Sequence, residues 1–235
     1  MAMVRIYKPN PPSVTVDSLM ERYDRAKQKQ DQSPTEERRP RSRSRGRHID
    51  QGNAHGGDQR REPSRNREGE RWARRREKLA LLYQTVLSDT EKLAAPQCMW
   101  QRFPLFQVTD LSQWLPETTT EVCLALCTLG SPLDDHMSSL SSQDMSAAAA
   151  LNEAALAWIV AITQELHQMV RDDVAEVGLS AGPAYRPGVG KWPLECQKIV
   201  FSHLPAHQID VSLTDTCLMM PGLSTSLIIP IKPLL

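Results

Sequence analysis

Apolar residues recur with a helical period in two stretches of the chain. The stronger stretch runs from about Ser146 to Val177 and is ended by Gly178, and the other runs from Glu70 to Ala95. Both are expected to be helices. A short helix near Val16 to Gln30, with Asp17 or Ser18 as cap, is a further option but is too polar to be stable alone. In the longest expected helix the apolar residues form one stripe, which comprises Leu151, Ala155, Trp158, Ile159, Ile162, Leu166, Met169, Val170 and Val174.

The centre of the chain is apolar and divided into short segments. Thr118 and Glu121 have the spacing of a capping box, and Gly130 follows the apolar run EVCLALCTL. This pattern predicts a further helix, with Cys123 and Cys127 as core residues on it. Residues 131–142 are expected to form a loop.

The period changes toward the C-terminus. The segment GLSAGPAYRPGVGKWP is rich in Gly and Pro and predicts a turn-filled connector. After it we expect three strands, at Cys196 to Leu204, at the alternating residues Ile209 to Leu213, and at Leu223 to Ile231.

The first part of the chain has no comparable apolar pattern. Its prolines break helices, and GNAHGGDQ offers too little apolar surface to offset the entropy of ordering. The sequence thus predicts a disordered Arg-rich arm over residues 1–69 and a domain over residues 70–235. The predicted fold class is mostly α within α+β, a small helical domain with a few C-terminal strands from about residue 192.

Charge is sorted along the chain, although the formal net charge is zero. Between Arg38 and Arg76 there are 14 Arg and 5 acidic residues, a charge of +9. From Leu79 to Leu235 there are 7 basic and 16 acidic residues, a charge of −9. A segment this basic favours a polyanion as partner, and RNA or DNA is the leading candidate. Of the two we predict RNA, single-stranded and bound without sequence preference.

Other chemistry has little support in the sequence. The motifs of serine hydrolases, zinc proteases and P-loop proteins are missing from it, and we expect a protein without catalytic residues and without a cofactor. No apolar run has the length of a membrane span. The 5 Cys are expected to be reduced. The usual zinc ligands, Cys sulfur and His nitrogen, occur near the C-terminus at Cys196, His203, His207 and Cys217. Because no C-x₂-C knuckle accompanies them, we expect no bound metal.

The leucine-rich run admits two interpretations. Val122, Leu124, Leu126 and Leu129 have the wide apolar spacing by which an amphipathic segment fills the groove of an export receptor. A buried helix has the same spacing, so core packing is the alternative.

The order of these parts resembles that of the umbravirus long-distance movement proteins. The likeness covers the layout of the whole chain and is carried by RRPRSRSRGR, RWARRR and VCLALCTLG. It implies packaging of viral RNA into ribonucleoprotein, protection of that RNA and movement through phloem. It also implies traffic through the nucleus and nucleolus with a fibrillarin partnership. From the residues themselves we further expect homo-oligomers, because the charge split lets copies associate, and shuttling between host cytoplasm and nucleus by nuclear transport receptors, because clustered Arg are an import signal.

The resemblance assigns roles to residues. RNA contact and nuclear import would fall to twelve arginines, and export or partner binding to Val122, Leu124, Leu126 and Leu129. The alternative is a nuclear-targeted adaptor or silencing suppressor that acts through protein contacts. The twelve arginines are Arg38, Arg39, Arg41, Arg43, Arg45, Arg47, Arg60, Arg61, Arg71, Arg74, Arg75 and Arg76.

Overall fold

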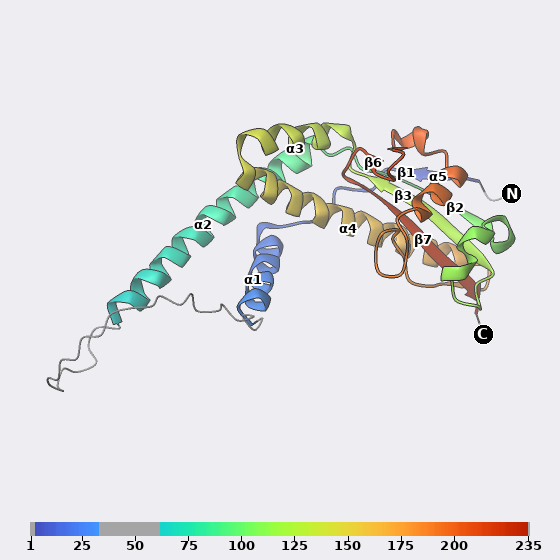
Figure 1. Cartoon of the computed structure of the whole chain (residues 1–235), viewed down its shortest axis with the longest axis horizontal. Helices are drawn as coiled ribbons and strands as arrows, with labels where there is room; N and C mark the ends of the chain where they lie inside the picture. The colour runs from blue at the N-terminus through green and yellow to red at the C-terminus, as the bar shows by residue number, and fades with distance from the viewer. Residues whose placement is uncertain (1–2, 33–61, 235) are drawn as a thin grey trace, which may run out of the picture.

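The protein is described here by a computed structural model that covers residues 3–32 and 62–234 (Figure 1). The helices are α1 (Val16–Gln32), α2 (Glu62–Leu93), α3 (Ser131–Gln143), α4 (Met145–Ala175) and α5 (Cys196–His203). The strands are β1 (Arg5–Tyr7), β2 (Gln97–Pro104), β3 (Glu121–Thr128), β4 (Leu179–Ala181), β5 (Ser212–Leu213), β6 (Met219–Met220) and β7 (Ser224–Pro233). Short 3-10 turns are η1 (Leu105–Gln107), η2 (Thr109–Trp114) and η3 (Ala206–Ile209).

An antiparallel sheet of five strands organises the body. Its order is β1-β2-β3-β7-β4, and β5 and β6 form a separate two-stranded ribbon. The long strands β2, β3 and β7 make the centre, with Leu124 of β3 opposite Gln101 of β2 and Ile228 of β7. The α+β fold class is thereby confirmed.

Helical structure covers the sheet on both faces. Cys123, Ala125 and Cys127 of β3 belong to the core shared with α1, α2, α3 and α4. The intervening Val122, Leu124 and Leu126 belong to a second core, which includes residues of α5 and the 3-10 turns. Successive strand side chains point to opposite faces, so a strand covered on both sides is apolar at every position.

The longest helix, α4, lies along one face of the sheet (Figure 1) and confirms the helix expected at Ser146 to Val177. Asp144 caps it, because its Oδ1 accepts hydrogen bonds from the backbone N–H of Ser146 at 2.9 Å and of Ala147 at 3.1 Å. By length and composition α4 could cross a membrane, but 56% of its apolar window is buried inside the molecule. Buried core helices have the same composition.

The helix α2 confirms the other predicted helix and begins eight residues earlier than expected, and α1 forms where a short helix was an option. The C-terminal half of α2 is anchored by buried Tyr83, Val86 and Leu87, whereas its N-terminal half extends away from the sheet beside α1 (Figure 1). Leu19 and Met20 of α1 are buried too.

The predicted domain boundary differs from the structure. Strand β1 pairs with β2 and α1 packs on α2, so these parts of residues 1–69 belong to the body rather than to a disordered arm. The sheet also draws strands from the first half of the chain instead of beginning near residue 192. Residues 33–61 lie outside the described part.

Three predicted elements were wrong. The segment 121–129 is strand β3 and not a helix, residues 131–143 form α3 and not a loop, and residues 196–203 form α5 and not a strand. Pro132 near the start of α3 and the buried four-residue repeat of Cys196, Val200 and Leu204 are helix signals.

The other C-terminal strands have mixed outcomes. Of the segment 209–213, only Ser212–Leu213 forms a strand and Ile209 is the last residue of η3, whereas the strand predicted at Leu223 to Ile231 is confirmed as β7. Isolated alternation over three apolar positions was therefore too short a signal for a strand.

Candidate functional site

A basic stripe follows one face of the N-terminal half of α2. It comprises Arg71, Arg74, Arg75 and Lys78, which are all exposed. Their spacing of three, four and seven residues places them on one side of the helix. Within the described residues none of the four forms an ion pair. The stripe is therefore free to bind an anion.

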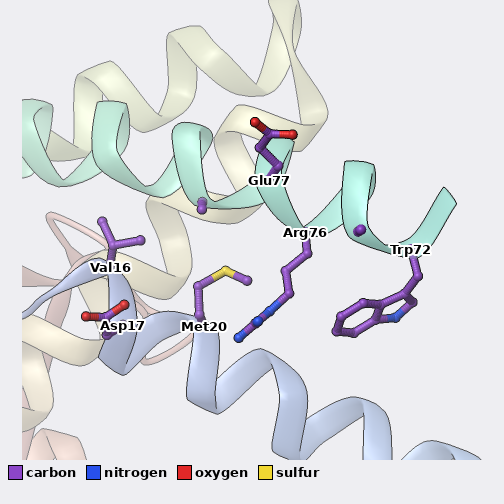
Figure 2. Close-up of a pocket in the computed structure, with 8 residues that line it drawn as sticks. Val16, Asp17, Met20, Trp72, Arg76 and Glu77 are labelled. Carbon is purple, nitrogen blue, oxygen red and sulfur yellow. The ribbon is translucent and has the colours of Figure 1, made fainter. Parts of the chain in front are cut away.

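The other side of the same helix faces α1 across an open cleft of about 440 Å³ (Figure 2). Arg76 points into it and pairs with Asp24 at 3.1 Å, and its guanidinium lies 5.7 Å from the ring centre of Trp72. The ammonium of Lys27 lies 4.8 Å from the same ring. Arg76 thus helps to hold α1 against α2 and differs in role from the stripe.

The predicted arginine cluster is only partly visible. Arg71, Arg74 and Arg75 come together on the stripe, while Arg76 lies on the cleft side. The remaining eight arginines lie outside the described residues. These are Arg38, Arg39, Arg41, Arg43, Arg45, Arg47, Arg60 and Arg61.

The predicted export segment is in the core. Val122, Leu124, Leu126 and Leu129 are each 0% exposed, and the first three belong to the central strand β3. A receptor groove needs these side chains on a surface. In the folded protein the segment is consequently a structural strand, and the core-packing alternative describes it.

A second candidate site is the loop after β4, defined here as the glycine loop, Gly182 to Trp192. It runs along α4, because the backbone oxygen of Gly182 lies 2.8 Å from Nε2 of His167 and Nη2 of Arg186 donates to Oγ1 of Thr163 at 3.2 Å. Tyr185 bonds through its backbone to Ile228 of β7. The loop therefore continues the edge of the sheet.

Arg186 is the distinctive residue of this glycine loop. It is half-buried, and among the described residues no carboxylate forms an ion pair with it. The backbone around it turns tightly, since Gly188 and Gly190 have φ of +83° and +63°. The planar fork of a guanidinium matches the two oxygens of a carboxylate.

The glycine loop contains two stacked aromatic residues and borders a small cavity. Tyr185 stacks on Trp192 with 5.0 Å between ring centres, and Trp114 lies 6.1 Å from Trp192. A cavity of about 150 Å³ opens beside Gly182 and Pro183, with Thr118, Thr119 and Lys232 among its lining residues. A side chain at Gly182 would stand 2.9 Å from Pro230, so the close approach needs glycine.

The sequence of this loop predicted only a turn-filled connector. The one available signal was an Arg within the Gly/Pro-rich segment YRPGVGKW, and a single such residue has no defined spacing to a partner. Its neighbours Thr163 and His167 come from a different element.

The zinc-type residues do not form a site in the described part of the chain. No group of three or more His, Cys, Asp or Glu side chains there is arranged to hold a metal ion. The ring of His203 packs edge-on against Phe103, with 5.2 Å between ring centres. Its Nε2 lies 3.1 Å from the backbone oxygen of Gln107.

The fold and the glycine loop define an α+β protein in which a sheet between two helical layers carries a glycine-rich edge loop. No family model and no curated protein matches this chain. A solved structure of the MetH reactivation domain bound to AdoHcy is similar, with a TM-score of 0.50 and 14% sequence identity. The match covers 97% of this chain and 78% of that chain, and it indicates a shared fold.

Proposed function

We propose that the body of this protein is a binding module for an amino-acid-bearing nucleoside of the S-adenosylhomocysteine class, with Arg186 as receptor for the ligand's carboxylate. Arg186 carries the proposal, because it is a half-buried guanidinium that has no carboxylate partner among the described residues. The similar MetH reactivation domain, which was solved with AdoHcy, suggests the ligand class.

The chemistry of such a ligand fits the surroundings of Arg186. The ligand has a carboxylate for the guanidinium, an adenine ring for stacking and ribose hydroxyls for backbone groups. The glycine loop supplies Arg186 for the carboxylate and the exposed backbone at Gly188 and Gly190 for the hydroxyls, and for the adenine ring it supplies the half-buried ring of Tyr185, which stacks on buried Trp192. The adjoining cavity of about 150 Å³ is smaller than ordinary ligand pockets of about 300–1,000 Å³ and would take part of the ligand.

The test compares two ligands and two variants by calorimetry. AdoHcy is expected to bind the wild type, and Arg186→Ala is expected to weaken it by about tenfold to a hundredfold, the value of a charge-assisted hydrogen bond. Adenosine, which has no carboxylate, should bind both proteins alike. Arg171→Ala, an exposed residue of α4, is the control. Absence of AdoHcy binding to the wild type would refute the proposal.

A second function is proposed for the basic stripe, which lies on α2 and not on the glycine loop. We propose that the stripe, together with the arginine tract of the sequence, binds single-stranded RNA without sequence preference. The observation that favours it is the exposure of Arg71, Arg74 and Arg75 on one helix face without ion-pair partners in the described part. Packaging of viral RNA, phloem movement and nucleolar traffic remain predictions that rest on the family resemblance.

RNA binding of this kind is tested by its salt dependence. Replacement of Arg71, Arg74 and Arg75 by Ala should reduce the log-log salt slope for single-stranded RNA by about 2, as three phosphate contacts contribute. The matched control replaces exposed Arg171, Lys191 and Lys198 and removes the same charge elsewhere. Equal effects of the two triple variants would show that only overall charge matters and would exclude the stripe as a site.

A further inference from the structure

Two buried cysteines from neighbouring strands touch at the centre of the sheet. Cys98 of β2 lies opposite Cys127 of β3 in the antiparallel register, and their sulfur atoms are 3.0 Å apart. Both side chains are 0% exposed and both are free thiols. The sulfurs need to approach by only about 1 Å to reach the length of a disulfide bond.

We propose that Cys98 and Cys127 form a reversible cross-strand disulfide under dithiol-oxidising conditions. With diamide as oxidant, the sulfur of one cysteine first adds to the N=N bond of the reagent. The sulfur of the other cysteine then attacks the first sulfur, an S–S bond forms, and the hydrazine product leaves. In total the two thiols lose two protons and two electrons, and the reagent gains both.

The pairing is selective because the remaining cysteine of the central strands has no thiol opposite it. Cys123 lies four residues before Cys127 on the same face of β3, but its cross-strand neighbours are Arg102 and Ile229. Cys123 and Cys127 are four residues apart along a strand and are therefore separated by about 13 Å. The register brings Cys98 to Cys127 instead.

Oxidation of the native protein should be slow. Burial raises the pKa of the Cys127 thiol well above its ordinary value, and the thiolate is the form that reacts. Access depends on local opening, for which β1 is suited. It is a three-residue edge strand, and its Tyr7 lies opposite Cys98. The disulfide would join β2 to β3 and stabilise the sheet by constraining the unfolded chain.

The experiment treats the full chain with diamide in native buffer, blocks remaining thiols with N-ethylmaleimide and counts them after unfolding. The count is expected to fall from five to three, with a peptide linking Cys98 to Cys127 in the mass spectrum. Dithiothreitol should restore all five thiols, and the oxidised form should unfold at a higher temperature than the reduced form.

Two cysteine variants test which thiols pair. Cys123→Ala should still form the cross-link, whereas Cys98→Ala should form no intramolecular disulfide with Cys127. Five free thiols after prolonged native oxidation, or a disulfide between other cysteines, would overturn the proposal. The peptide map of the wild type decides this even if a variant does not fold.

Discussion

Gly130 shows how one residue directs the chain from the central strand into α3. Its φ of +84° is unfavourable for residues with a side chain, and an added Cβ would stand 3.1 Å from Cβ of Ala95. We expect Gly130→Ala to lower the free energy of unfolding by about 1–3 kcal/mol, measured by urea titration. Gly69→Ala is the control. It lies in α2 with open space around it and should raise stability by about 0.5–1 kcal/mol.

Equal effects of the two glycine variants would contradict this account of Gly130. The comparison separates backbone strain from the general effect of a methyl group, because of these two glycines only Gly130 has a positive φ.

Tyr83 makes a pH-dependent contribution to the free energy of unfolding. Its hydroxyl donates to the carboxylate of Glu153, and burial, followed by this carboxylate, raises the pKa of Tyr83 above its ordinary value. The folded protein therefore keeps the proton where the unfolded chain loses it. This contribution is complete below pH of about 10 and is lost as the pH rises above it.

Tyr83→Phe should remove this loss. Between pH of about 10 and 11 the wild type should lose about 1 kcal/mol more than the variant, in addition to any loss shared by both. Denaturant titrations at several alkaline pH values give the slopes. An unchanged slope in Tyr83→Phe would exclude Tyr83 as the source.

At the scale of elements, β3 is the clearest difference between expectation and structure. Its run EVCLALCT is apolar because helices and turns cover both faces of the sheet, and such a run has neither the period of a half-exposed strand nor that of an amphipathic helix. The capping-box spacing at Thr118 and Glu121 then favoured a helix. Eight residues is an ordinary strand length, so length favoured a strand.

Burial of β3 predicts the effect of truncating its leucines. Leu124→Ala should lower the free energy of unfolding by about 2–5 kcal/mol, because it leaves a cavity in a core whose neighbours are fixed by strand pairing. Leu81→Ala, at an exposed position of α2, should change the free energy of unfolding by less than about 0.5 kcal/mol. Loss of nuclear export in a Leu124 variant that keeps full stability would contradict the structural role.

At the scale of the whole molecule, the sorted charges favour self-association. The arginine tract of one copy can meet the acidic body of another when RNA is absent, since the two parts carry +9 and −9. Such contacts are screened by salt because the Debye length falls to about 3 Å at 1 M.

Light scattering at micromolar protein tests this association. We expect oligomers at low salt that become smaller at about 0.5 M salt, with single-stranded RNA competing for the same arginines. Replacing Arg71, Arg74 and Arg75 by Ala should shift the low-salt distribution toward the monomer. A monomer of unchanged mass at every salt concentration would exclude charge-driven association.

The sequence by itself determined the elements whose pattern is local. The helices α2 and α4 and the strand β7 follow from apolar spacing and from Gly and Pro at their ends, and the charge division follows from composition. The tertiary structure alone decided what depends on distant neighbours. Covering both faces of the sheet made 121–128 a strand, register brought Cys98 to Cys127, and packing placed Arg186 against Thr163 of α4 with no ion-paired carboxylate among the described residues. These outcomes follow from contacts between residues far apart in the chain, which spacing within one segment does not encode.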